Sequence, residues 1–176
     1  VSVVDEACSY FMPHHGIQRI GHPTTPLRIV FNASAPTSTG LSLNKILYTG
    51  PKLQSDLQTI LLNFRLFPYV FTADVRRMYL QILMDLPDRR YQRFIWRYHP
   101  KESLKVFELN VVVFGVASSP YQAQRVLKLL AEEESDSYPL AAEIVRRDGY
   151  IDDFVCSLES EEKLLSAYHQ LNSLLA

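Results

Sequence analysis

The chain lacks both a long hydrophobic run and a cysteine cluster. No apolar run approaches the roughly 18 residues of a membrane span, and no signal-peptide pattern is present. The two cysteines, Cys8 and Cys156, stand without a CxxC or Cys/His spacing. This excludes a zinc site of the usual spacing and favours reduced thiols in an intracellular protein. A membrane partner is not expected.

The chain also lacks an excess of charge of either sign. Its formal net charge is −1, which excludes a strong overall attraction to nucleic acid and leaves only local basic patches. Hydrophobic residues make up 47% of the chain and charged residues 21%, which are the proportions of a folded globular protein. We therefore expect the 176 residues to form one domain or two small lobes.

An acidic turn between two short apolar runs is the most informative stretch. Asp152 and Asp153 lie within residues 148–156, a pattern that predicts a β-hairpin with carboxylates at its tip. Upstream, a β-rich run over residues 69–74 ends in Asp74. If the two strand ends meet, three carboxylates converge, and their mutual repulsion favours bound divalent cations such as Mg²⁺. The pattern predicts phosphoryl or nucleotidyl transfer with two metal ions.

The same acidic pair has an ordinary structural explanation. Asp tolerates turn geometry and bonds its own backbone, so two Asp residues between hydrophobic runs are also typical of a solvated turn. The stretch by itself leaves both interpretations open.

Hydrophobic periodicity predicts helices and strands in irregular alternation. Strands are expected over residues 17–20, 27–31, 69–74, 91–98 and 104–109, and helices over 52–65, 120–134, 140–147 and 161–175. This order favours an α+β fold in which helices pack on one face of an antiparallel sheet.

The alternation in residues 91–98 predicts a strand with two different faces. Arg93 and Arg97 fall on one face, which we expect to be solvated, and the aromatic residues Phe94, Trp96 and Tyr98 fall on the other. Nucleic-acid binding by this mixture of arginines and aromatics is the alternative.

A series of short motifs, in a fixed order, gives the chain a family resemblance. The motifs are Pro13-His14-His15-Gly16, Leu27-Arg28-Ile29-Val30-Phe31-Asn32-Ala33-Ser34, Ser42-Leu43-Asn44, Gly50-Pro51, Ala73-Asp74, Gln92-Arg93-Phe94-Ile95-Trp96-Arg97, Phe114-Gly115 followed by Ser119-Pro120, and Tyr150-Ile151-Asp152-Asp153. From about residue 10 to residue 159 the chain resembles the reverse transcriptases of Bel/Pao-type long-terminal-repeat retrotransposons. The resemblance implies the fingers (1–50 and 82–119) and palm (51–81 and 120–176) of a right-hand polymerase, ending before a thumb.

The resemblance also implies a metal-binding set. Asp74 and Asp152 match the carboxylates that bind two Mg²⁺ ions, with Mn²⁺ as an alternative. Asp153 matches a less directly engaged neighbour, and the Val75 carbonyl matches a further ligand. Gly149 stands where relatives commonly carry an aromatic residue, and we expect it to loosen the start of the hairpin.

A second implied set binds the nucleotide and primer. Arg28 resembles the residue that contacts the incoming triphosphate, a role suited to a permanent cation. Tyr79 matches the aromatic gate that crowds a ribose 2′-hydroxyl, and a core aromatic of the palm is the alternative. Phe114 and Gly115 match the segment under the nucleotide and template base, and Tyr150 matches a position near the primer terminus.

The implied activity is DNA synthesis templated by RNA or DNA. A primer 3′-hydroxyl attacks the α-phosphate of a deoxynucleotide and pyrophosphate leaves. The expected partners are primer–template, deoxynucleotides and further parts of a polyprotein (thumb and RNase H), without which we expect the chain to be inactive. The compartment, a cytoplasmic particle or the nucleus, stays open. The alternatives are a degenerate or domesticated remnant that binds nucleic acid or a protein, and a metal-dependent nuclease, which no residue favours.

Overall fold

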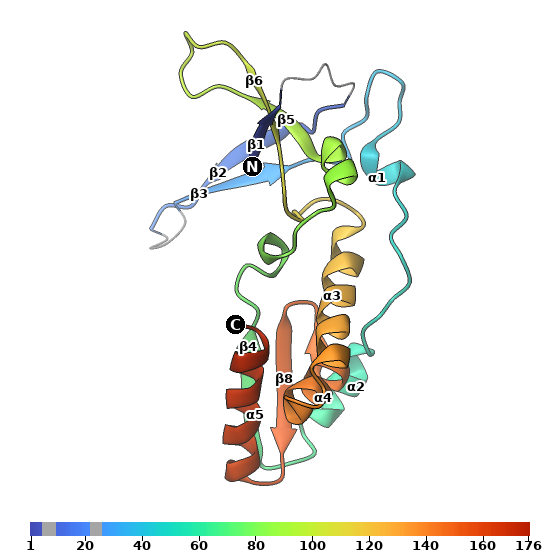
Figure 1. Ribbon diagram of the computed structural model, residues 1–176, viewed down its shortest axis with the longest axis vertical. Coiled ribbons are helices and arrows are strands. Elements are labelled where there is room, and N and C mark those ends of the chain that lie inside the picture. The colour runs from blue at the N-terminus through green and yellow to red at the C-terminus, as the bar shows by residue number, and fades with distance from the viewer. Residues whose placement is uncertain (5–9, 22–25) are drawn as a thin grey trace. The chain divides into compact units, whose positions relative to one another are not determined.

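The computed structural model describes residues 1–4, 10–21 and 26–176 (Figure 1). The prediction about the Cys8 thiol lies outside these residues. The chain folds into two compact units, one of Val1–Gly50 with Tyr79–Ser119 and one of Pro51–Met78 with Pro120–Ala176. Both combine helices with antiparallel sheets. No helix in the described ranges has the length and apolar character needed to cross a bilayer.

The first unit contains two small antiparallel sheets and short helices. One sheet has the strand order β1-β6-β5 and the other pairs β2 with β3. The elements are β1 (Ser2–Val4), β2 (His14–Gln18), β3 (Leu27–Phe31), α1 (Leu43–Ile46), η2 (Leu86–Gln92), β5 (Arg93–Trp96) and β6 (Lys105–Glu108), with η1 (Met78–Gln81) at the junction between the units.

The predicted hairpin of the first unit begins earlier than expected. β2 starts at His14 instead of residue 17 and pairs along its whole length with β3. The Pro13 carbonyl accepts a 2.8 Å hydrogen bond from the Asn32 amide. The extended pairing therefore continues through the two histidines, which the apolar pattern of residues 17–20 does not reveal.

Arg93 is buried, contrary to the predicted solvated face. Arg93 is only 8% exposed. Its Nε donates a 2.8 Å hydrogen bond to Oε2 of Glu108, which is its register partner on β6. Trp96, predicted to lie in the core, is 46% exposed. Burial along β5 falls from Arg93 to Trp96 and does not alternate as predicted. The Arg93 charge lies inside because an opposite charge from the neighbouring strand compensates it.

The second unit is built around a three-stranded antiparallel sheet of order β4-β8-β7. Its strands are β4 (Tyr69–Asp74), β7 (Gly149–Tyr150) and β8 (Asp153–Leu158), and its helices are α2 (Leu57–Asn63), α3 (Ser119–Glu133), α4 (Pro139–Arg147) and α5 (Glu161–Leu174). Figure 1 shows β4 and β8 next to α5.

One row of side chains on this sheet forms the core of the second unit. Phe154 and Cys156 of β8 pack with Ala131 of α3, Ile144 of α4 and Leu171 of α5. Because side chains alternate across a strand, the intervening residues of β8 belong to the other face. On that other face, Ser157 is covered by α2, while Asp153 at the start of the strand stays exposed.

The helix predicted over residues 52–65 is shorter, with α2 covering only Leu57–Asn63. Asp56 precedes it in an extended conformation, and its carboxylate pairs with Lys52. Its backbone carbonyl accepts the first helical bond from the Ile60 amide at 3.1 Å. Residues 52–56 thus form a non-helical segment before α2. Leu53 fits the helical spacing but lies outside the helix.

Candidate catalytic site

The predicted acidic hairpin is confirmed. Tyr150 of β7 pairs with Asp153 of β8, so Ile151 and Asp152 form a two-residue turn. Ile151 has φ = 59°, the positive sign that a type II′ hairpin turn requires at its first central position. A β-branched residue in this conformation is strained.

The end of β4 and the tip of the hairpin are neighbours, as predicted. Asp74 is the register partner of Asp153 in the antiparallel pairing of β4 with β8. One residue further on, the Val75 amide donates a 2.8 Å hydrogen bond to the Asp152 carbonyl. Directly opposed residues point to the same face of a sheet, and Asp74 and Asp153 line a shallow open pocket together with Thr72 and Val155.

The three carboxylates do not form a ready-made cluster. In the part of the chain that the structure describes, no three His, Cys, Asp or Glu side chains are grouped so that they could hold a metal ion. The predicted convergence is therefore corrected to an opposed pair, Asp74 and Asp153. Asp152 lies in the turn before β8 and meets β4 through its backbone carbonyl, whereas Asp153, the first residue of β8, is opposed to Asp74.

This donor set nevertheless fits Mg²⁺. Mg²⁺ is usually held by one or two carboxylates together with substrate phosphates, and seldom by a cage made only of protein. The Val75 carbonyl accepts a 3.2 Å bond from the Met78 amide, which leaves one of its two lone pairs available. The second unit thus offers carboxylate and carbonyl oxygens that a phosphate-bound ion prefers.

Backbone strain is concentrated beside these carboxylates. Within the described ranges, the non-glycine residues with positive φ are Arg77, at 54°, and Ile151, at 59°. Arg77 follows Asp74 by three positions and Ile151 precedes Asp152. Such conformations persist only where surrounding contacts enforce them, and they are frequent at functional sites.

Gly149 tightens the start of the hairpin, whereas we expected it to loosen it. A Cβ at this position would lie 3.0 Å from the Val145 carbonyl oxygen and 3.3 Å from the Phe154 ring. The missing side chain therefore lets β7 approach α4 closely.

Asp148 has a structural role that the sequence analysis did not predict. It is 0% exposed, and Arg147 binds both carboxylate oxygens, through Nε at 2.9 Å and Nη2 at 2.8 Å. This bond raises the pKa of the Arg147 guanidinium. The Asp148 carbonyl also accepts from the Val155 amide at 3.2 Å, so the pair anchors the base of the hairpin. Nothing in the local sequence marks this Asp as buried.

Three of the predicted nucleotide-binding residues gather in the first unit. The Arg28 guanidinium carbon lies 5.5 Å from the centroid of the Phe114 ring. The Tyr79 ring meets the Phe114 ring edge to face, with centroids 4.4 Å apart. Phe114 is 49% exposed and Tyr79 only 6%. Phe114 therefore offers an open ring beside a cation, while the burial of Tyr79 agrees with the alternative of a core aromatic.

Gly115 and Asn44 fix the Phe114 segment. Gly115 has φ = 93°, and a Cβ there would lie 2.5 Å from the Phe31 carbonyl oxygen. The Asn44 side chain donates to the Gly115 carbonyl at 2.8 Å and accepts from the Ala117 amide at 2.8 Å. Asn44 stands in one of the recognised motifs, but its bonding role depends on residues more than 70 positions away.

Comparison with known proteins gives a fold and no sequence family. No family model matches the chain, and no curated protein sequence does either. The chain is similar to a crystal structure of the protease-reverse transcriptase of prototype foamy virus (selenomethionine-labelled CSH mutant), with a TM-score of 0.69 and 15% sequence identity over 98% of this chain. It spans 20% of that protein's length. The chain therefore has a fold similar to part of that protease-reverse transcriptase, with mixed helices and antiparallel sheets.

Proposed function

We propose that this chain is the fingers and palm of a reverse transcriptase of the Bel/Pao type, a DNA polymerase templated by RNA or DNA. The observation that carries the proposal is the register of Asp74 with Asp153, together with the bond between Val75 and the Asp152 turn. This arrangement places acidic oxygens at one end of a sheet, in a fold similar to part of a retroviral protein. In this proposal the first unit is the fingers and the second unit is the palm.

In the proposed reaction, Asp74, Asp152 and the Val75 carbonyl would hold Mg²⁺, with Asp153 as their neighbour. Bound Mg²⁺ would neutralise charge on the reacting phosphate and orient its oxygens. The residues themselves supply rigidity, because β4 and the turn are joined by backbone hydrogen bonds. Preorganised groups need little rearrangement during the reaction, which lowers its barrier.

The first unit supplies the proposed contacts to the nucleotide. The Arg28 guanidinium carries a permanent charge and several donors, which suit a triphosphate. Phe114 presents half of its surface to solvent, and Tyr79 holds its ring in place. We assign the 2′-hydroxyl gate to Tyr79, the support of the base to Phe114 and Gly115, and the primer terminus to Tyr150. Primer–template, deoxynucleotides and further polyprotein parts such as a thumb and RNase H are the proposed partners.

Primer extension tests this function. The polypeptide that naturally carries this chain is purified and given a labelled primer on an RNA or DNA template, with each deoxynucleotide offered separately. We expect Mg²⁺-dependent addition of the complementary nucleotide and loss of this activity in Asp152→Asn. Asp136→Asn, at an exposed carboxylate of the same unit, is the matched control and should extend like the wild type.

The possible results separate the alternatives. Extension by Asp152→Asn at the wild-type rate would overturn the proposed mechanism. Retained primer–template binding without any extension would identify a binding remnant. Shortening of the primer in place of extension would identify a nuclease.

A further inference from the structure

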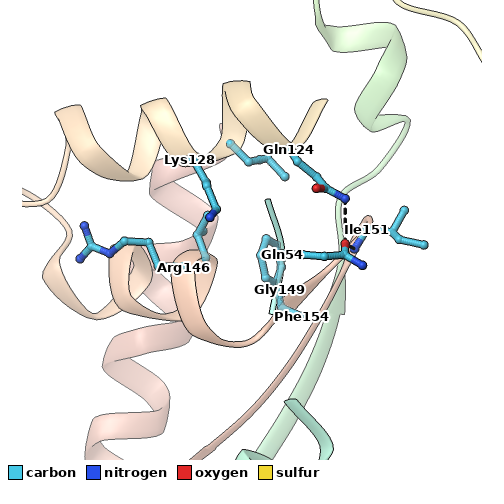
Figure 2. A pocket seen from close by; sticks show the side chains of 9 residues that line it. Gln54, Gln124, Lys128, Arg146, Gly149, Ile151 and Phe154 are labelled. Atoms are coloured by element: carbon cyan, nitrogen blue, oxygen red, sulfur yellow. Dashed lines mark hydrogen bonds between the residues drawn. The ribbon is translucent and has the colours of Figure 1, made fainter. Parts of the chain in front are cut away.

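Two glutamines and the hairpin turn form a chain of hydrogen bonds in the second unit. The Ile151 amide donates to Gln54 Oε1 at 3.1 Å, and Gln124 Nε2 donates to the same oxygen at 2.7 Å. Figure 2 shows Gln54, Gln124 and Ile151 meeting at one side of a small pocket that they help to line. The partners are separated by 97 and 70 positions in the sequence, so this contact exists only in the folded unit.

The hydrogen bond from the Ile151 amide to Gln54 is made by a residue with a strained backbone. Ile151 has φ = 59°, and the left-handed conformation costs a side-chain-bearing residue about 1 to 2 kcal/mol. Ile151 cannot relieve this strain without moving Asp152 and Asp153, which follow it directly. A contact that holds the Ile151 amide therefore acts on the position of both carboxylates.

Gln124 fixes the orientation of the Gln54 side chain. An amide side chain can present either its oxygen or its nitrogen, and only the oxygen can accept the Ile151 N–H. Gln124 extends from α3 and also needs an acceptor, so the bond between the two glutamines selects the same orientation. In Figure 2, Gln124 reaches from α3 toward Gln54, and Ile151 lies next to both.

We propose that Gln54 is a positioning residue that, oriented by Gln124, holds the strained Ile151 turn in the conformation that presents Asp152 and Asp153 to β4. The consequence for catalysis rests on the proposed function. The effect on the turn does not, since it follows from the hydrogen bonds and the backbone conformation alone.

The test compares three variants. Gln54→Ala removes the acceptor. Gln54→Glu keeps an oxygen that can accept from both Ile151 and Gln124. Gln170→Ala is the matched control, because Gln170 also accepts backbone bonds in the same unit, from Leu140 at 2.9 Å, but at the start of α4.

Hydrogen exchange of the Ile151 amide, followed by NMR, is the first readout. We expect Gln54→Ala to accelerate it about three- to tenfold, the effect of losing one hydrogen bond, while Gln54→Glu and Gln170→Ala stay within twofold of the wild type. Equal exchange in Gln54→Ala and wild type would overturn the proposal, whether or not the protein polymerises.

Primer extension is the second readout. We expect Gln54→Ala to lower kcat with little change in the KM for primer–template, and Gln54→Glu to restore it, because misplaced carboxylates impair the reaction step and leave binding intact. Unchanged kcat in an active protein whose Ile151 exchange is accelerated would overturn the catalytic part. Absence of extension by the wild type would instead contradict the proposed function and leave the exchange result as the test of the turn.

Discussion

Asp74 and Asp153 stand directly opposite each other on neighbouring antiparallel strands. Both residues are exposed and face a shallow pocket. Like charges at opposed positions of a sheet destabilise it. A fold that keeps this pair at the end of its sheet therefore carries an electrostatic cost that a bound cation would remove.

The first prediction is that Asp153→Asn stabilises the chain when no divalent cation is present. Removing one of two opposed charges should raise the free energy of unfolding by some tenths of a kcal/mol, up to about 1 kcal/mol. Urea denaturation in a chelating buffer measures it, with Asp136→Asn as the control. With millimolar Mg²⁺ this advantage of the variant should shrink, because the Asp153 carboxylate beside the site strengthens cation binding to the folded wild type. A variant less stable than the wild type in chelator would refute this explanation.

The second prediction concerns two glycines that both have a positive φ but have different surroundings. Gly115 (φ = 93°) would place a Cβ 2.5 Å from the Phe31 carbonyl oxygen, whereas Gly40 (φ = 78°) has open space. Gly115→Ala and Gly40→Ala should each lower the free energy of unfolding by about 1 kcal/mol, because alanine is strained at a positive φ. Gly115→Ala should cost at least about 1 kcal/mol more because of the clash. Equal losses in thermal unfolding would show that the close approach to Phe31 is absent.

The third prediction concerns the buried pair of Arg93 and Glu108. Arg93→Met leaves the Glu108 carboxylate buried beside an apolar group, which should destabilise the protein by about 3 to 5 kcal/mol. The double change Arg93→Met with Glu108→Leu should recover most of this loss, since it removes both buried charges. Denaturant unfolding of the two variants measures the difference. A double variant no more stable than Arg93→Met would contradict the prediction.

The fourth prediction is a loss of stability at high pH caused by Cys156. Burial raises the pKa of this thiol from 9.0 to about 12. Between pH 9 and 12 the unfolded chain loses the thiol proton and the folded chain keeps it, so the free energy of unfolding should fall as pH rises. Below pH 9 the thiol is protonated in both states and has no effect on the slope.

The Cys156→Ala variant provides the comparison. It leaves a small cavity at every pH, but it should lose stability less steeply than the wild type above pH 9. Parallel stability curves for the two proteins, measured by urea denaturation, would show that the folded and unfolded thiols titrate alike.

The local sequence was sufficient to predict the acidic hairpin and the strand that ends at Asp74. Both are short apolar runs with a polar end, and their pairing follows from the need to bury Phe154 and Cys156 on one face of the sheet. The α+β character follows in the same way, from helical spacing between the strands.

Polar contacts between residues far apart in the sequence could not be predicted from the local sequence pattern. Arg93 was predicted to face solvent because its partner, Glu108, belongs to another strand. Asp148 and Gln54 look like surface residues in the sequence, yet one is buried by Arg147 and the other binds a turn 97 positions away. The prediction that three carboxylates converge is also corrected, because Asp152 lies in the turn and meets β4 through its backbone, while Asp153 is opposed to Asp74.

The most direct test of the central claim is the location of a bound Mn²⁺ ion in the folded chain. Paramagnetic Mn²⁺ broadens the NMR signals of nearby amides. We predict that broadening at low Mn²⁺ concentration is strongest at Asp74, Val75, Asp152 and Asp153, and that Asp74→Asn removes it while Asp136→Asn does not. Broadening centred elsewhere, or unchanged in Asp74→Asn, would contradict the claim that the end of β4 and the hairpin turn form one cation site.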